Sequence, residues 1–323
     1  MQRRTLLAGG LALVLAKPFG AARAATYPDR PISMVIGYTA GGLTDVMSRL
    51  IADRMAAELG QNVIVENRPG AAASIAAAKV MEAPPDGYTL LLGTASLAIN
   101  PTLQPRLTPR APPKDLLPIG TAYFSPFVLL VRDDFPATNL KEFIAYAKSH
   151  PGEINVASSG NGAVNHLLLE MFNRRAQVEL THIPYKGASQ ALVDLRGGRI
   201  AATFATPTDA LPVMRAGAGR ILAVTSAERI ALLPEVPAIA ETLPGFHGVF
   251  WQALFAPVGT PPAITDKLAA ALRASTEDAA LRAQVQERGI TLQSGGPEQL
   301  RKQLTDETQM WRQLITDAGI TID

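Results

Sequence analysis

Short apolar runs alternate with segments of helical periodicity along most of the chain. Residues 32–38 are apolar and rich in β-forming side chains, and apolar residues then recur every three or four positions up to Met55. Thr44 is a candidate N-cap for this helix, with Asp45 in its first turn. The same pattern predicts strands at 61–66, 88–93, 127–131, 154–158, 179–183, 200–204, 221–225 and 250–255, and helices at 71–81, 140–149, 163–174, 189–196, 263–275, 278–288 and 297–318.

This order of elements predicts an α/β fold. Strands that alternate with helices over short links form parallel sheets, which helices cover on both faces. The plan occurs once before residue 125 and again after it, so we expect two domains. The many prolines of residues 100–118 argue against a helix or a central strand there and predict an irregular excursion.

The N-terminus has the pattern of an export signal. Arg3 and Arg4 precede an apolar stretch at 5–16, and residues 22–24 offer a small-x-small cleavage site. We therefore expect residues 1–24 to be cleaved and the mature protein to be periplasmic. Export by the Sec route and by the twin-arginine route both fit the paired arginines. No other run reaches the roughly 20 apolar residues of a membrane span, so we expect a soluble mature protein. We also expect it to be a monomer.

The amino-acid composition argues against several classes of function. The chain has no cysteine, which excludes thiol catalysis, Cys-ligated zinc and iron–sulfur clusters. Its formal net charge is only +2, part of which lies in the predicted signal, so nucleic-acid binding is not expected.

Glycine-bearing turns connect several predicted strands to the following helices. Such a turn leaves unpaired backbone N–H groups at the positive end of a helix dipole, an arrangement that suits a carboxylate. These turns lie at 37–45, 67–71, 158–162 and 184–189, and we interpret 67–71 as structural. Several anion-binding turns without a nucleophile indicate binding rather than chemistry.

The residues that catalysis would need are missing or scattered. The four histidines do not have metal-ligand spacing, and Ser158 and Ser159 lack a Gly-x-Ser-x-Gly elbow with acid and histidine partners. The turn at 37–42 is neither a dinucleotide fingerprint nor a P-loop. We expect no enzyme activity, no metal site and no cofactor.

Eight ordered motifs resemble the periplasmic solute receptors of tripartite tricarboxylate transporters, also called Bug receptors. They run in order over essentially the whole mature chain, which makes the resemblance far more specific than any single glycine motif. The motifs are Tyr-Pro-Asp-Arg-Pro-Ile at 27–32, Ala-Gly-Gly-Leu-Thr-Asp at 40–45, Val-Glu-Asn-Arg-Pro-Gly-Ala at 65–71, Pro-Asp-Gly-Tyr-Thr-Leu-Leu at 85–91, Ser-Ser-Gly-Asn-Gly at 158–162, His-Ile-Pro-Tyr-Lys-Gly at 182–187, Leu-Ala-Val-Thr-Ser at 222–226 and Leu-Pro-Glu-Val-Pro at 233–237.

The resemblance implies a type II periplasmic-binding-protein fold, in which two doubly wound lobes close around a ligand in the manner of a Venus flytrap. Residues 26–124 with 250–323 would form lobe 1, and residues 125–249 would form lobe 2. The strands near Phe127 and Phe250 would be the crossovers.

The resemblance also implies a binding site made of neutral donors from both lobes, often acting through water and without a dedicated arginine. Asp45 either contacts the ligand or stabilises the first helical turn, and Lys186 either attracts the anion or is a solvated rim lysine. The implied ligand contacts are Tyr38, Thr39, Ala40, Gly41, Gly42, Thr44 and Asp45 from lobe 1, and Ser158, Ser159, Asn161, Tyr185, Lys186, Gly187, Ala188, Ala205 and Thr206 from lobe 2.

Three positions of lobe 2 depart from the family pattern. Ala201 and Ala205 stand where an acidic residue is common, and Thr206 stands where asparagine is common. An acid there could meet the ammonium of an amino acid, so its absence favours a plain or hydrophobic carboxylate.

The resemblance thus implies a receptor that captures a small organic carboxylate and delivers it to the permease subunits of a tripartite transporter. A sensory receptor that presents the carboxylate to a membrane kinase is an alternative, and an exported enzyme acting on such an acid is a third hypothesis.

Overall fold

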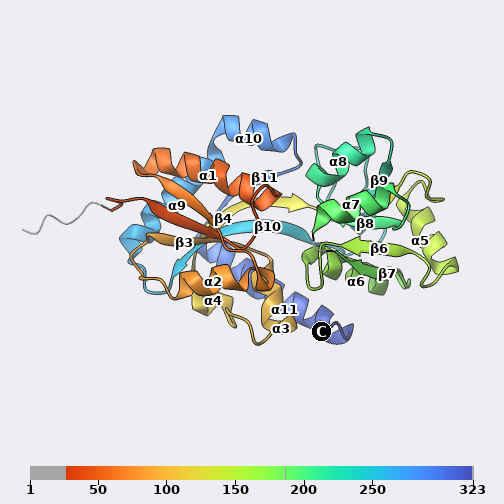
Figure 1. The fold of residues 1–323 in the computed structure, drawn as a ribbon, viewed down its shortest axis with the longest axis horizontal. Coiled ribbons are helices and arrows are strands. Elements are labelled where there is room, and N and C mark those ends of the chain that lie inside the picture. Colours follow the sequence, from red (N-terminus) through yellow and green to blue (C-terminus); the bar gives the residue numbers. More distant parts are fainter. Residues whose placement is uncertain (1–26, 186, 322–323) are drawn as a thin grey trace, which may run out of the picture.

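The computed structural model describes residues 27–185 and 187–321, which form two sheet-and-helix units (Figure 1). Residues 1–26, which include the predicted signal, and Lys186 lie outside the described residues. Unit 1 contains a six-stranded sheet and unit 2 a five-stranded sheet. Both are covered by helices, as the alternating pattern predicts.

The sheet of unit 1 is mixed. β1 is parallel to both of its neighbours, β2 and β3, whereas β10 is antiparallel to β3 and β4, and β11 is antiparallel to β4. All of β1 except Ser33 is buried, as expected for a strand with helices on both faces. In spatial order the strands are β11 (Thr291–Gly295), β4 (Leu116–Pro126), β10 (Val249–Pro257), β3 (Thr89–Thr94), β1 (Ile32–Ile36) and β2 (Val63–Asn67).

Helices cover both faces of this sheet. The apolar faces of α1 (Leu43–Leu59), α9 (Pro262–Glu277) and α10 (Ala279–Gln286) share one core cluster with the sheet. The other face packs against α2 (Ser74–Met81), α3 (Ser96–Leu103) and α11 (Pro297–Asp317). The short helix α4 (Pro112–Asp115) precedes β4, and the 3₁₀ turn η1 (Ala71–Ala73) precedes α2.

Unit 2 repeats the plan on a smaller scale. β6 is parallel to β7 and β8, and β5 is antiparallel to β8 and β9. α7 (Ala188–Arg196) and α8 (Pro207–Arg215) cover one face, while α5 (Leu140–Ser149) and α6 (Val164–Ala176) cover the other. The strands in spatial order are β7 (Thr181–Pro184), β6 (Asn155–Ser158), β8 (Ala202–Ala205), β5 (Val128–Arg132) and β9 (Gly219–Val224), and η2 (Ile239–Glu241) is a 3₁₀ turn.

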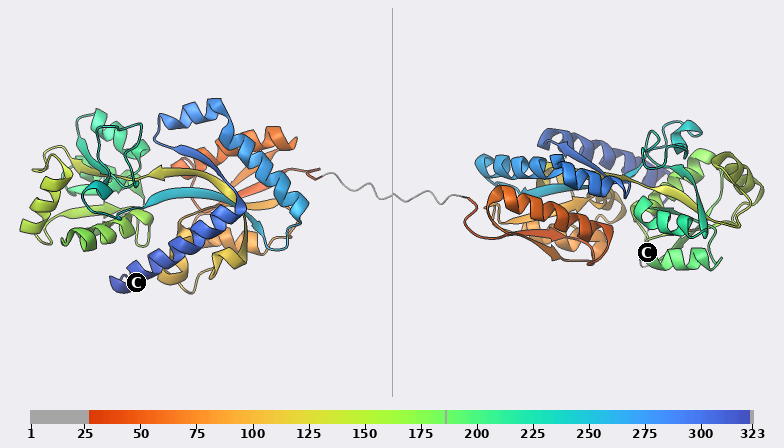
Figure 2. Two further views of the ribbon diagram at one scale, coloured as in Figure 1. Left: turned by 180° about the vertical axis from the view of Figure 1, so that it is seen from behind. Right: turned by 90° about the horizontal axis from the view of Figure 1, so that it is seen from above.

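Two long strands lead from one unit to the other. β4 ends at Pro126 and β5 begins at Val128 in the second sheet, while the return path enters unit 1 along β10 (Figure 1). Seen from behind, α11 runs alongside these strands toward unit 2 (Figure 2), where Arg174 of α6 contacts Asp317 at 3.2 Å. One apolar cluster is continuous through both units.

Several elements differ from the predicted ones. The sheets are mixed rather than parallel, the expected excursion contains α3 and α4, and β4, β11 and α8 were not predicted. Pro118 lies inside β4, beside a register irregularity of β4 with β10 at Leu254 and Phe255. Such an irregularity accommodates a residue without an N–H in a central strand. Within the described ranges, no helix is long and apolar enough to cross a membrane.

Candidate functional site

The turn after β1 leads into α1 without a side-chain cap. The N-cap residue is Gly42, so Thr44 lies in the first turn of the helix and is not the predicted cap. Gly41 has a φ of +86°, in the region where glycine is favoured. The first N–H groups of α1 are therefore not capped by a side chain and are left without an intrahelical partner at the start of the helix.

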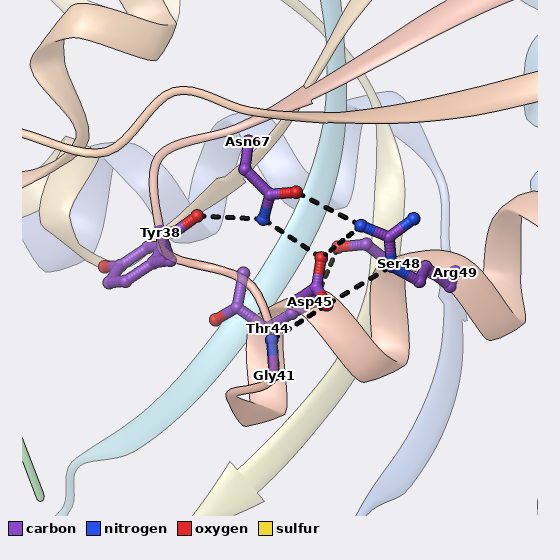
Figure 3. A network of polar contacts seen from close by, with 7 residues as sticks. All are labelled: Tyr38, Gly41, Thr44, Asp45, Ser48, Arg49 and Asn67. Atoms are coloured by element: carbon purple, nitrogen blue, oxygen red, sulfur yellow. Dashed lines mark hydrogen bonds and ion pairs between the residues drawn. The ribbon is translucent and has the colours of Figure 1, made fainter.

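A network behind this turn holds Asp45 in place (Figure 3). The Arg49 guanidinium donates to both carboxylate oxygens at 2.8 and 3.2 Å, Asn67 donates at 3.0 Å, and the Gly41 N–H donates at 3.0 Å. Asn67 also donates to the carbonyl of Tyr38 at 3.0 Å. The bonds from Arg49 lower the pKa of Asp45 to about 2, against the opposing effect of burial. Asp45 thus organises the turn from behind.

Tyr38 stands at the other side of the turn. Its hydroxyl is 3.0 Å from Thr94 Oγ1 at the end of β3 and 3.1 Å from Ser96 Oγ at the start of α3. These three hydroxyl groups fix the ring against the carboxyl end of the sheet.

Unit 2 presents a second set of helix starts. α6 begins after Ala163 and α7 after Gly187, again without a capping side chain. Asn165 in the first turn of α6 accepts from the Ser159 N–H and hydroxyl at 3.2 and 3.0 Å. Its amide donates to the Phe204 carbonyl at the end of β8 at 3.2 Å. Asn165 thereby ties the predicted Ser159 turn to the neighbouring strand.

α8 begins in a different way. Thr206 is its N-cap and accepts from the Asp209 N–H at 3.2 Å, while the Thr206 hydroxyl donates to Asp209 Oδ2 at 2.8 Å. Burial raises the pKa of Asp209, and the bond from Thr206 acts in the opposite direction.

A cavity of about 230 Å³ lies where these helix starts meet. Residues of both units line it, and three phenylalanines give it apolar walls. Among the described residues, the lining contains no cationic side chain. The lining residues are Tyr38, Thr39, Gly42, Leu43, Thr44, Ser96 and Phe250 of unit 1, Ser159, Ala163, Val164, Asn165, Ala188, Phe204, Ala205, Thr206 and Asp209 of unit 2, and Phe127 between them.

Eight of the sixteen sequence-predicted contacts line this cavity, and seven others do not. Asp45 is held by its network, and the Tyr185 hydroxyl donates to Asp194 at 2.8 Å, within unit 2. Lys186 lies outside the described residues. The cavity is lined by Tyr38, Thr39, Gly42, Thr44, Ser159, Ala188, Ala205 and Thr206, but not by Ala40, Gly41, Asp45, Ser158, Asn161, Tyr185 or Gly187.

Ser158 has a histidine partner that the sequence did not suggest. Its Oγ lies 2.6 Å from His182 Nε2, and the His182 ring stacks on His166 with centroids 3.9 Å apart. Burial lowers the pKa of both histidines, that of His166 to about 4. Ser158 is fully buried and does not line the cavity, and its Oγ donates to the Gly160 carbonyl at 3.1 Å, so this pair supports the loop.

Some lining residues had no signal in the sequence. Asn165 and Asp209 lie in the first turns of helices, where polar side chains usually serve as caps. Phe204 and Phe250 belong to strands, where apolar residues usually belong to the core. Asp209, three residues after Thr206, and Asn165, four residues after Asn161, could have been found by extending the predicted site into the following helical turn. No group of three or more His, Cys, Asp or Glu side chains that could hold a metal ion occurs within the described part of the chain.

Known proteins match this chain over most of its length. A family model described as the tripartite tricarboxylate transporter family receptor matches residues 47–320. The protein BugT of Bordetella pertussis is 36% identical over 297 residues, which cover 91% of each chain.

Solved structures are similar as well. The periplasmic binding protein BugD is 34% identical with a TM-score of 0.80, and covers 91% of this chain and 99% of its own. The R. palustris protein Rpa4515, solved with adipate, is 33% identical with a TM-score of 0.83, and covers 91% of this chain and 99% of its own. These matches confirm the resemblance drawn from the motifs and the predicted fold class.

Proposed function

Because the chain belongs to the family of tripartite tricarboxylate transporter receptors, we propose that it is a periplasmic receptor for a small organic carboxylate. The observation that carries the proposal is the meeting of three uncapped helix starts, those of α1, α6 and α7, at one cavity between the two units. Uncapped N–H groups at the positive ends of helices favour an anion. The adipate bound to Rpa4515 supports this ligand class.

In this proposal the carboxylate of the ligand lies at the start of α1. The N–H groups around Gly42 and the hydroxyl of Thr44 donate to it, and Ser159 approaches from unit 2. Tyr38 forms one wall, fixed by its contacts with Thr94 and Ser96. Neutral donors bind an anion less tightly than a buried ion pair does, which suits a receptor that must release its ligand.

Capture would occur by closure of two lobes, residues 26–124 with 250–323 and residues 125–249. β4 and β10, which lead between the units, are the natural hinge elements. A ligand that contacts both lobes favours the closed state, because the open state cannot make both sets of contacts. Delivery to permease subunits in the membrane, and export through the signal at residues 1–24, complete the proposal.

Thermal unfolding of the mature protein with a panel of small carboxylates tests the proposal. A ligand at a hundred times its Kd stabilises the folded state by about 2.7 kcal/mol and raises the Tm. Mass spectrometry of the heat-released ligand should return it unchanged, as expected for a receptor and not for an enzyme. The absence of stabilisation by every acid of a broad panel would refute carboxylate binding.

A further inference from the structure

Asp209 is the only charged side chain among the described residues that line the cavity. It lies in the first turn of α8, in unit 2, whereas the proposed carboxylate site lies in unit 1 at the start of α1. Both line the same cavity, so a ligand bound in the proposed way at the start of α1 can reach toward Asp209 with its other end.

The carboxylate of Asp209 is only partly used by the protein. Oδ2 accepts the hydroxyl proton of Thr206 at 2.8 Å, and the Thr206 Oγ1 caps the helix through the Asp209 N–H. Within the described ranges, Oδ1 makes no hydrogen bond and Asp209 has no ion-pair partner. One carboxylate oxygen is thus available to a ligand.

The surroundings of Asp209 make a carboxylate oxygen without a hydrogen-bond donor unfavourable. Phe204 and Ala205, at the end of the preceding strand, and Phe250 from unit 1 line the same cavity. A half-buried charge beside apolar walls loses hydration, and a donor that replaces the lost water recovers that free energy. The described residues supply no such donor to Oδ1, so a ligand or water can provide it.

We propose that Asp209 determines specificity by selecting a monocarboxylate whose opposite end carries a hydrogen-bond donor, either a hydroxyl or an ammonium group. The proposal rests on the proposed function, in which the other end of the ligand is a carboxylate. A second carboxylate in the position of the donor would face Asp209 and be repelled. This ligand class differs from adipate, the dicarboxylate bound to Rpa4515.

Asp209 changes the interpretation of Ala205. The absence of an acid at position 205 suggested a plain carboxylate, but Asp209 supplies an acid to the same wall from the next helical turn. The wall thus has an acidic group, displaced along the chain from the position where the family pattern places one.

The experiment compares matched acids by calorimetry on the wild-type mature protein and the Asp209→Asn variant. At each of three chain lengths, those of butyrate, pentanoate and hexanoate, the panel contains the unsubstituted acid, its terminal hydroxy and amino derivatives and the dicarboxylate. The asparagine amide of the variant would keep an acceptor for Thr206, so α8 should retain its cap, and thermal unfolding without ligand checks this. Asp134→Asn is the control, because Asp134 is 77% exposed and outside the cavity.

At neutral pH and one of these lengths, we expect the wild type to bind a donor-bearing acid at least about tenfold more tightly than the unsubstituted acid, as for a hydrogen bond to a charged group. Asp209→Asn should lose that preference and bind the dicarboxylate more tightly, and Asp134→Asn should change neither. If Asp209→Asn lowered the affinity for the amino acid more than the affinity for the hydroxy acid, an ammonium would be the preferred donor.

Two results would overturn the inference while leaving the proposed function intact. One is that the wild type binds the donor-bearing acids no more tightly than the unsubstituted acids. The other is an equal change of all affinities in Asp209→Asn, which would show that Asp209 interacts with the protein rather than the ligand. If no carboxylate bound the wild type or either variant, the proposed function itself would fail.

Discussion

The aspartates of α1 and α8 occupy the same place in their helices but opposite environments. Each is the third residue after the N-cap, Asp45 after Gly42 and Asp209 after Thr206. Asp45 accepts from Arg49, Asn67 and a backbone N–H, and its pKa falls to about 2. Asp209 accepts from one hydroxyl, and burial raises its pKa.

The Arg49 guanidinium accounts for most of the low pKa of Asp45, and the N-cap residues of the two helices differ as well. Gly42 has no side chain, so the first N–H groups of α1 remain open to the cavity while Asp45 turns back to the N–H of Gly41. Thr206 caps α8 itself, which leaves part of the Asp209 carboxylate for other contacts. One aspartate is therefore structural, and we propose that the other meets the ligand.

The largest effect is expected for Asp45→Ala. The substitution leaves Arg49, Asn67 and the Gly41 N–H without their common acceptor, and the Asp45 side chain is only 7% exposed. We expect a loss of about 2–3 kcal/mol in the free energy of unfolding by urea, at the low end for a buried pair because Arg49 can return to water. Asp209→Ala should cost clearly less. Equal losses would contradict the division into a structural and a ligand-facing aspartate.

The acid response of Asp45 should be almost as large. Its folded-state pKa of about 2 lies below its ordinary value of 3.8, so its stabilisation is present above pH 4 and is lost as the pH falls toward 2. The difference in unfolding free energy between wild type and Asp45→Asn should therefore shrink by about 2 kcal/mol over that range. Taking the difference removes the parallel response of Glu66, whose pKa is also about 2.

Asp209 should respond with the opposite sign. Because its folded-state pKa is raised, its contribution is fully present below its ordinary pKa and is lost as the pH rises through the folded-state value. The same urea titrations on Asp209→Asn, without ligand, measure it. A response of the same sign as that of Asp45 would show that Asp209 has a strong partner in the protein.

Removing the cap of α8 should have a smaller effect. Thr206→Ala deletes the acceptor for the Asp209 N–H and should cost about 1 kcal/mol in urea unfolding, whereas Thr206→Ser keeps the hydroxyl and should cost a few tenths. If Thr206 also positions Asp209, then Thr206→Ala should weaken the preference for donor-bearing acids and Thr206→Ser should preserve it. If Thr206→Ala and Thr206→Ser had the same stability and the same ligand preference, the hydroxyl would neither cap α8 nor position Asp209.

The sequence predicts local structure better than it predicts the cavity. The strand, glycine turn and helix of residues 32–59 follow from periodicity, because their pattern lies within a short stretch of chain. β4 was missed because its place depends on pairing with β10 and β11, far along the chain, and because Pro118 argues against a central strand. α8 was missed because of Pro207 and Pro212, although Pro207 at the first helical position is favourable.

The candidate site was predictable only in part, because it too depends on contacts between residues far apart in the chain. Glycine turns marked the helix starts that reach the cavity, but the walls come from residues whose local pattern indicates core or cap, such as Phe204 and Asp209. Their meeting depends on the packing of two units. The family motifs supplied what local pattern could not, namely that the turns of residues 37–45 and 158–162 face a common space.

Gly42→Ser should have the smallest effect on stability and the clearest one on function. Gly42 has a φ of −83°, and a side chain there meets no atom within 4 Å, so serine fits without strain. It would cap α1 as Thr206 caps α8, adding only a few tenths of a kcal/mol to the unfolding free energy. Yet the new hydroxyl would compete with the ligand for the first N–H groups of α1 and lower carboxylate affinity several-fold in calorimetry. Gly42→Ala is the matched control, because it adds the bulk without the acceptor. If serine weakened binding no more than alanine, the open start of α1 would not be the carboxylate site, and the contrast between the two helix starts would have no role in binding.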